Sequence, residues 1–200
     1  MYKQLTKKIL MDAHNKFREK EGRYSFFDMS KKLMENGFKT EGRLLLLAGW
    51  NGAWFSKISR NFKITEFETL MKRCEPLFKK LKNKTLTDSE ISEIEDDTKA
   101  IYKILSSNNA VKYTGATKLM SLEIPSLFVM WDDAIRNDNR YAINGISPDN
   151  YVEFLKIIKK NIDGIIWDEK SIPLAKVIDE YNYVTITLKP ANKKNKNIGG

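Results

Sequence analysis

The chain has 200 residues, of which 42% are hydrophobic and 11% are aromatic, and its formal net charge is +9. This length predicts one domain or two closely packed lobes, and the apolar content is enough for a core, which excludes global disorder. No apolar run reaches the roughly 18 residues of a membrane helix, and the first residues lack the apolar stretch of a secretory signal.

The composition also limits disulfide and metal chemistry. Cys74 is the single cysteine, so it cannot form an internal disulfide, and with His14 as the single histidine there are too few soft ligands for a zinc site. We therefore expect a protein of the reducing cytoplasm without a structural metal. His14 stands in a lysine-rich amphipathic segment, so we predict a surface histidine and not a catalytic one.

Apolar residues recur at helical spacing through most of the chain. In chain order, this pattern predicts helices over residues 5–17, 29–35, 41–50, 62–84 with a break or kink at Pro76, 87–105, 148–162 and 171–181. Two of them begin with capping signals, because Thr87-Asp-Ser-Glu90 has the order of a capping box and Ser147-Pro148 is a cap followed by proline.

The C-terminal part departs from this pattern. Alternation from Tyr183 to Leu188 predicts one short strand or extended segment, and the polar, lysine-rich residues after Pro190 predict a disordered basic tail. The sequence thus predicts an all-α domain over residues 1–189, with one short C-terminal strand, followed by a tail at 190–200.

The positive charge is typical of proteins that bind nucleic acid, because neutralising phosphates releases condensed counterions. Six acidic residues fall within residues 87–98, so the positive charge of the remaining residues is larger than the net charge of the whole chain. A lysine-rich proteome would give the same surplus, so charge alone leaves both interpretations open.

Residues 106–136 contain the candidate site. A helix is expected to end near Ser106, a polar turn follows, and a new helix is expected to open around Gly115, which is a helix-hairpin-helix layout. A glycine there lets the backbone approach a ligand closely, and the N–H groups of the opening helix can hold a phosphate. A short apolar segment then leads to Asp132, directly after Trp131.

This stretch resembles the helix-hairpin-helix DNA glycosylase superfamily, which includes endonuclease III-like and 8-oxoguanine glycosylase-like enzymes. Gly115 matches the second hairpin glycine, Asp132 matches the family's aspartate, and Ile135-Arg136 matches the apolar–basic pair behind it. The sequence departs from the pattern at Lys112-Tyr113, where proline and the first glycine belong, and the spacing from Gly115 to Asp132 is about one helical turn short. Thr117 stands where bifunctional members have their catalytic lysine, and Lys118 follows it.

A second point of resemblance lies upstream, in the apolar residues 44–48 and the following Gly49-Trp-Asn-Gly-Ala-Trp-Phe55. It resembles the family's apolar helix that ends in a polar residue, which enters the gap left by a flipped base. Asn51 matches that residue, with Trp50 or Trp54 beside the base, where extraction needs a wedge and a stacking surface.

The resemblance implies a monomeric helix-hairpin-helix glycosylase-like domain that binds duplex DNA and removes a damaged or modified base without a metal or organic cofactor. Asp132 would stabilise the sugar cation or activate the nucleophile, and Lys118 would be the Schiff-base amine if the enzyme also cleaves the strand. The predicted DNA contacts, including a basic segment over residues 72–84, are Trp50, Asn51, Trp54, Lys79, Lys80, Lys82, Lys112, Gly115, Ala116, Thr117 and Arg136.

Structural interpretations of the same residues stay open. Trp131 is a natural core residue, Trp50 or Trp54 can be buried, Asp132 can cap the turn that follows it, and Lys118 can be one more solvated lysine. Two other functions also stay open. One is a hairpin protein that binds nucleic acid without catalysis, and the other is an adaptor whose basic surface meets an acidic protein.

Overall fold

The structure is a computed structural model that describes residues 5–50 and 52–188. All regular structure in these ranges is helical, as predicted, in the order α1 (Lys7–Lys20), α2 (Tyr24–Glu35), α3 (Lys39–Trp50), α4 (Gly52–Ile58), η1 (Ser59–Asn61), α5 (Ile64–Leu81), α6 (Ile91–Ser106), α7 (Lys112–Glu123), α8 (Asp133–Asn137), α9 (Pro148–Asn161), α10 (Leu174–Asn182) and η2 (Tyr183–Thr187). None of the helices in these ranges has the length and apolarity required to span a bilayer.

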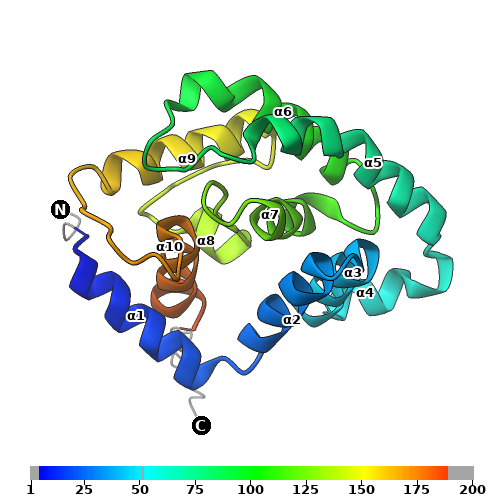
Figure 1. The fold of residues 1–200 in the computed structure, drawn as a ribbon, viewed down its shortest axis with the longest axis horizontal. Helices are drawn as coiled ribbons and strands as arrows, with labels where there is room; N and C mark the ends of the chain where they lie inside the picture. The colour runs from blue at the N-terminus through cyan, green and yellow to red at the C-terminus, as the bar shows by residue number, and fades with distance from the viewer. Residues whose placement is uncertain (1–4, 51, 189–200) are drawn as a thin grey trace, which may run out of the picture.

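Helix α7 runs through the middle of the molecule (Figure 1). It packs against α6 on one side and against α3 and α2 on the other, while α5 and α9 cover α6. Every residue from Gly115 to Leu122 is buried, including the polar residues Thr117, Lys118 and Ser121. A helix buried all round places any polar side chain that it carries inside the core.

The C-terminal helix closes the fold against the N-terminal one. Helix α10 packs along α1, and η2 then contacts both α1 and the short helix α8 (Figure 1). This closure overturns the prediction of a surface histidine. His14 is 8% exposed, and its Nδ1 atom lies 2.5 Å from Oε2 of Glu180 in α10.

The predicted strand or extended segment at residues 183–188 is also wrong, because Tyr183–Thr187 form the π-helical turn η2 and Leu188 caps it. The β-branched alternation is overridden by direct continuation of α10. The Thr185 hydroxyl donates to the carbonyl of Tyr181 over 2.7 Å, as threonines do in helices, and Val184 is buried.

Two helix starts were predicted from capping signals, and one is confirmed. Ser147 caps α9 through a reciprocal capping box with Asn150. The other start lies one turn later than predicted, because α6 begins at Ile91. Thr85 and not Thr87 accepts a backbone hydrogen bond here, from the Asp88 N–H over 3.0 Å. Pro76 does not break α5, which continues to Leu81.

The α2–α3 pair provides a test of packing. A Cβ atom added at Gly42 would lie 2.5 Å from the Ser30 carbonyl oxygen, a backbone atom that cannot move without separating the helices. We predict that Gly42→Ala lowers the free energy of unfolding by about 1–3 kcal/mol, the usual cost of overpacking. Urea unfolding followed by circular dichroism measures it.

Gly52→Ala is the matched control for this prediction. Gly52 is also helical, but a Cβ atom there meets nothing within 4 Å, so the substitution should leave stability unchanged or raise it by up to about 1 kcal/mol. Equal effects of the two substitutions would show that helix propensity, not the close approach at Gly42, decides the outcome.

Candidate functional site

A pocket of about 160 Å³ lies where the end of α3, the middle of α7, the segment before α8, helix α10 and η2 meet. It brings together Trp50, Lys118 and Asp132, three residues that the sequence singled out. Its lining consists of Arg23, Trp50, Lys118, Met130, Trp131, Asp132, Ile135, Asp179, Tyr183 and Thr187.

Lys118 enters this pocket from the buried helix α7. It is only 7% exposed, and its Nζ atom donates a 2.6 Å hydrogen bond to the carbonyl of Trp50, the last residue of α3. Desolvation lowers the pKa of Lys118 to about 8, although the carboxylates of Asp132 and Asp179 act in the opposite direction. A lysine with this pKa carries an appreciable neutral fraction near pH 8, as a nucleophilic amine requires.

Asp132 is held in one orientation by two hydrogen bonds. Its Oδ1 atom caps α8 by accepting the Ile135 N–H over 2.8 Å, and its Oδ2 atom accepts from the Thr187 hydroxyl over 3.3 Å. The capping interpretation is therefore confirmed, and the cap itself keeps the carboxylate at the pocket wall. The neighbouring Asp133 is exposed and pairs with Arg136 over 2.7 Å, away from the pocket lining.

A buried chain of charged groups lies behind Asp179. Lys176 in α10 is 6% exposed, and its Nζ atom lies 2.7 Å from Asp179 Oδ2 and 3.8 Å from Glu180 Oε1. Glu180 in turn contacts His14. Burial alone would lower the pKa of Lys176, but the two carboxylates raise it above its ordinary value. The positive charge of Lys176 is thus balanced by the carboxylates of Asp179 and Glu180.

The aromatic wall of the pocket is fixed by its own neighbours. The Trp50 indole N–H donates to the Arg23 carbonyl over 2.9 Å, and its ring stacks on Phe17 with centroids 5.9 Å apart. Tyr183 meets Trp50 edge to face at 5.6 Å and donates to Glu21 over 2.5 Å. Glu21 also holds the guanidinium of Arg23, which lies over the Trp50 ring at 5.3 Å.

Helices α6 and α7 are joined by a short turn, which lies earlier than predicted. The turn connects α6 to α7 over residues 107–111, and α7 opens at Lys112, whose φ of 55° is in the left-handed region. The prediction that Gly115 opens the helix is therefore wrong. Gly115 instead allows α3 to approach α7, because an added Cβ would lie 3.2 Å from Leu47.

The other predicted DNA contacts of α7 also point into the core. Ala116 and Thr117 are fully buried, so neither side chain reaches a surface on which DNA could lie. The Thr117 hydroxyl is within 3.3 Å of both the backbone N and the carbonyl O of Trp131, which ties α7 to the segment that carries Asp132. In the structure, Ala116 and Thr117 position the segments that pack against α7.

Lys79, Lys80 and Lys82 are exposed at the C-terminal end of α5, and Lys80 pairs with Asp97 over 3.1 Å. The N-terminal half of α5 lies beside the turn between α6 and α7, where Thr65 and, at mid-helix, Arg73 line a hollow with Asn108. From Thr65 to Lys79 the helix rises about 21 Å. The hairpin and these lysines are therefore at opposite ends of α5.

Asn51 lies outside the described residues. Trp54 lies in α4. Arg136 is half-buried and is engaged by Asp133 and by the carbonyl of Ile143 over 3.3 Å. Trp50, the predicted base contact whose side chain the structure describes, lies in the pocket.

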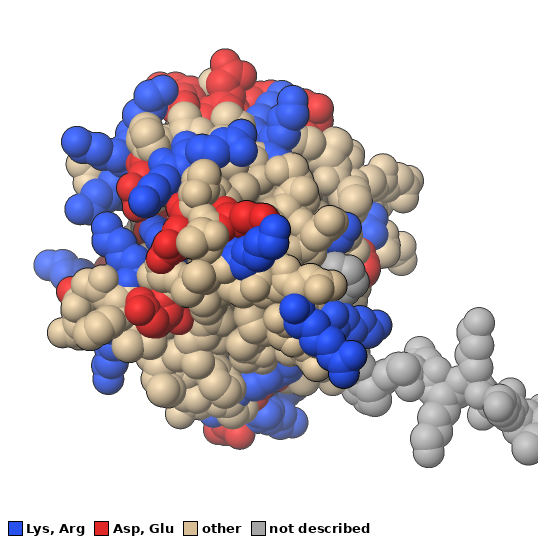
Figure 2. Space-filling model, turned by 90° about the vertical axis from the view of Figure 1, so that its right-hand side faces the viewer, with Lys and Arg blue, Asp and Glu red and all other residues tan. Residues whose placement is uncertain are grey.

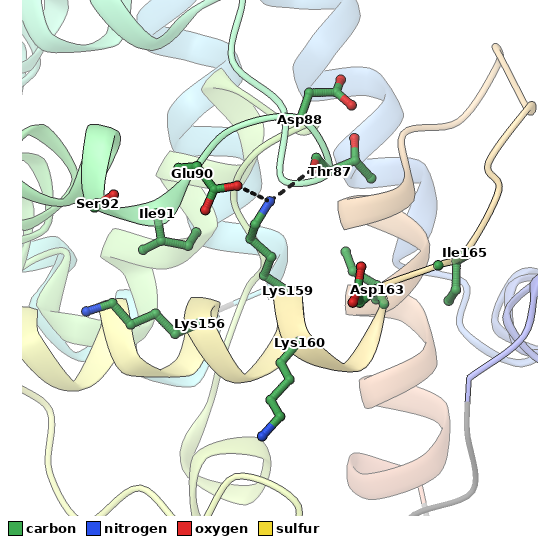
Figure 3. Close-up of a pocket in the computed structure, with 12 residues that line it drawn as sticks. Thr87, Asp88, Glu90, Ile91, Ser92, Lys156, Lys159, Lys160, Asp163 and Ile165 are labelled. Atoms are coloured by element: carbon green, nitrogen blue, oxygen red, sulfur yellow. Dashed lines mark hydrogen bonds and ion pairs between the residues drawn. The ribbon is translucent and has the colours of Figure 1, made fainter.

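A wider hollow of about 690 Å³ lies between the α5–α6 loop and the C-terminal end of α9 (Figure 3). Its lysines do not form an anion site, because Lys159 is bound to the Thr87 carbonyl over 3.0 Å and lies 3.8 Å from Glu90. Lys160 points away from these groups (Figure 3). Basic side chains on the face at the right of Figure 1 likewise stand in separate groups among acidic and uncharged ones (Figure 2).

The sequence analysis missed Arg23, Asp179, Tyr183 and Thr187. Asp179 carried a usable signal, because Lys176 and Asp179 are spaced i, i+3 and can meet on one face of a helix. The others reach the pocket through the packing of α10 and η2 on α1, which local patterns do not reveal. Comparisons of the chain with protein-family models, with curated proteins and with solved structures find no match.

The pocket predicts how the pKa of Lys118 responds to a charge change. Asp179 favours the charged amine, so Asp179→Asn should lower the pKa of Lys118 further below about 8. The ¹³Cε shift of Lys118 in lysine-labelled protein reports this titration, and its absence in Lys118→Gln assigns the resonance. Asp163→Asn, an exposed acid outside the pocket lining, should leave the titration unchanged. A rise in the pKa of the Asp179→Asn variant would contradict the assigned electrostatics.

Proposed function

We propose that this protein is a DNA glycosylase with lyase activity, in which Lys118 is the nucleophile and Asp132 the catalytic carboxylate. The observation that carries the proposal is the buried Lys118 amine, with a pKa of about 8, in one pocket with Asp132 and Trp50. A lysine, a carboxylate and an aromatic surface are what base removal through a covalent intermediate requires. The net charge of +9 and the hairpin between α6 and α7 support DNA as the substrate.

The proposed reaction begins with the neutral amine. The Nζ lone pair of Lys118 forms a bond to C1′ of the target nucleotide as the glycosidic bond breaks, and the electron pair of that bond leaves with the base, which takes up a proton. The attached amine then loses its proton, and opening of the sugar ring gives an imine between Nζ and C1′. Loss of a C2′ proton allows elimination of the 3′ phosphate, which cleaves the strand.

Asp132 supports the step at which positive charge develops on the sugar. An ionised carboxylate held close to that charge stabilises the transition state, because its orientation is already fixed before the reaction. The α8 cap and Thr187 supply this orientation. The burial of Lys118 supplies the neutral fraction of the nucleophile at pH 8.

The α6–α7 turn is the proposed contact to the DNA backbone. A hollow of about 560 Å³ beside it is lined by Lys57 and Lys63 together with residues 107–110 of the turn. Arg73 lines the adjoining hollow on α5. Glu66 lines both hollows as well and pairs with Lys63 over 2.9 Å, an exposed pair that a phosphate can displace. The cations beside the exposed turn suit the phosphates of a strand whose base enters the protein.

Imine formation can be tested without knowing the target base. We predict that borohydride traps the wild-type protein on a duplex with an abasic site, with a yield that rises from pH 6 to pH 9 as Lys118 loses its proton. Lys118→Gln should reduce trapping at least about 100-fold. Lys170→Gln, an exposed lysine outside the pocket lining, should leave it unchanged.

The outcomes of this experiment separate the functions. Duplex binding without trapping would favour a hairpin protein without catalysis, and absence of both would favour the adaptor. Asp132→Asn should retain duplex binding and lose base release on duplexes with uracil, a T·G mismatch, 8-oxoguanine or alkylated bases. Equal base release in wild type and Asp132→Asn would keep the enzyme and reject this residue.

The DNA surface is tested with two triple variants of equal charge change. We predict that glutamate at Lys57, Lys63 and Arg73 weakens duplex binding and flattens its salt dependence, with about 0.9 lost from the log–log slope for each phosphate contact. Glutamate at Lys79, Lys80 and Lys82 should have a smaller effect, since these residues line neither hollow beside the turn, although Arg73 is only about 9 Å from Lys79 along α5. Fluorescence anisotropy at several salt concentrations measures both. The reverse order would place the interface at the other end of α5.

A further inference from the structure

We propose that Asp179 is the base that removes the C2′ proton when the strand is cleaved. This inference rests on the proposed function and names the proton acceptor of its last step. The acceptor has to lie close to Lys118, because C2′ is two bonds away from the Nζ atom once the imine has formed. Asp179 lines the same pocket as Lys118, and its charge acts on the Lys118 amine.

The other ionisable side chains of the pocket lining are less suited to accept this proton. Arg23 is a cation and has no acceptor atom. Tyr183 keeps its own proton, because burial raises its pKa to about 12. Both oxygens of Asp132 already accept hydrogen bonds, from the Ile135 N–H and from the Thr187 hydroxyl. Such bonds favour the charged form of a carboxylate, so Asp132 is suited to stay ionised beside the sugar.

Asp179 is engaged on one side only. Its Oδ2 atom accepts from Nζ of Lys176 over 2.7 Å, whereas its Oδ1 atom has no hydrogen bond within residues 5–50 and 52–188. Lys176 is itself held against the rings of Phe17 and Phe27, with Nζ 5.6 Å and 4.5 Å from their centroids. The carboxylate therefore has one oxygen that is fixed and one that can take a proton.

The surroundings of Asp179 also increase its affinity for a proton. Burial raises the pKa of Asp179 above its ordinary value, and the charges of Glu180 and Asp132 act in the same direction, although Lys176 opposes them. A base accepts a proton more readily as its pKa approaches the working pH. The two pocket carboxylates are thus suited to different tasks, Asp132 as a fixed charge and Asp179 as a base.

Proton transfer to Asp179 starts the elimination of the 3′ phosphate. In the protonated imine, the C2′–H bond breaks and its proton bonds to Oδ1 of Asp179. The electron pair of that bond forms a double bond between C1′ and C2′, while the imine π pair moves to Nζ of Lys118. The enamine then returns this pair to the imine, a double bond forms between C2′ and C3′, and the C3′–O bond breaks with its electrons on the leaving phosphate.

The experiment separates imine formation from strand cleavage on a duplex with an abasic site. Borohydride trapping measures the imine, and gel analysis without borohydride measures cleavage, both in single turnover at pH 9, where the Lys118 amine is largely neutral. We expect Asp179→Asn to retain trapping and to slow cleavage about 100-fold, as loss of a general base does. Asp163→Asn, an exposed acid outside the pocket lining, should change neither rate.

This pattern distinguishes a base from a residue that only shapes the pocket. A structural role would make Asp179→Asn lose trapping and cleavage together, and a role through charge alone would lower the pKa of Lys118 and leave cleavage undiminished. Either result overturns the inference, as does a larger loss of cleavage in Asp132→Asn than in Asp179→Asn. Absence of trapping in the wild type overturns the proposed function as well, whereas normal trapping with undiminished cleavage by Asp179→Asn overturns this inference alone.

A second variant addresses folding, because Asp179→Asn removes the nearest partner of the buried Lys176. Lys176→Met combined with Asp179→Asn removes both charges of the pair, a change that buried ion pairs often tolerate. Glu180 keeps its contact with His14 in this variant. Circular dichroism checks the fold, and we again expect trapping without cleavage. Cleavage at the wild-type rate by the folded double variant overturns the inference.

Discussion

Burial of an ammonium group without an ion-pair partner is the constraint on which this site depends. Within residues 5–50 and 52–188 two lysines are buried, and their pKa values are shifted in opposite directions. Lys176 has a carboxylate 2.7 Å away and a second at 3.8 Å, and its pKa is raised. Lys118 has a backbone carbonyl at 2.6 Å instead, and desolvation lowers its pKa to about 8. The nearest partner of each lysine, and not how deeply it is buried, decides whether its pKa is raised or lowered.

The packing of α7 creates this environment. A lysine on a helix with an exposed face would extend along the surface and keep its charge in water. Gly115 and Ala116 instead allow α3 to cover this part of α7, so the end of α3 closes over the lysine and presents the Trp50 carbonyl. Thr117 fixes the Asp132 segment on the next face. Gly115, Ala116 and Thr117 were predicted to contact DNA. They instead pack on the core side of the pocket and position its walls.

The sequence analysis recovered what depends on local pattern and missed what depends on distant packing. The helical class and the Ser147 cap follow from periodicity and capping chemistry. The placement of Lys118 and Asp132 in one pocket was expected from the family resemblance. The misplaced hairpin turn followed from assigning Gly115 to a turn, when a glycine inside a helix can equally mark a close helix approach. The buried His14 and the helical η2 depend on α10 folding back onto α1, which no window of the sequence contains.

Folding stability accounts for the burial of Lys176 but not for the burial of Lys118. Lys176 satisfies the rule that buried charge is paired, and removing it would leave Asp179 and Glu180 without their cation. Lys118 satisfies no such rule. Lowering its pKa from 10.5 to about 8 costs the folded state about 3 kcal/mol, a cost that is complete below pH 8 and vanishes above pH 10.5. An apolar residue of similar length would avoid it. The retention of such a group beside a fixed carboxylate supports the chemistry proposed for its nitrogen.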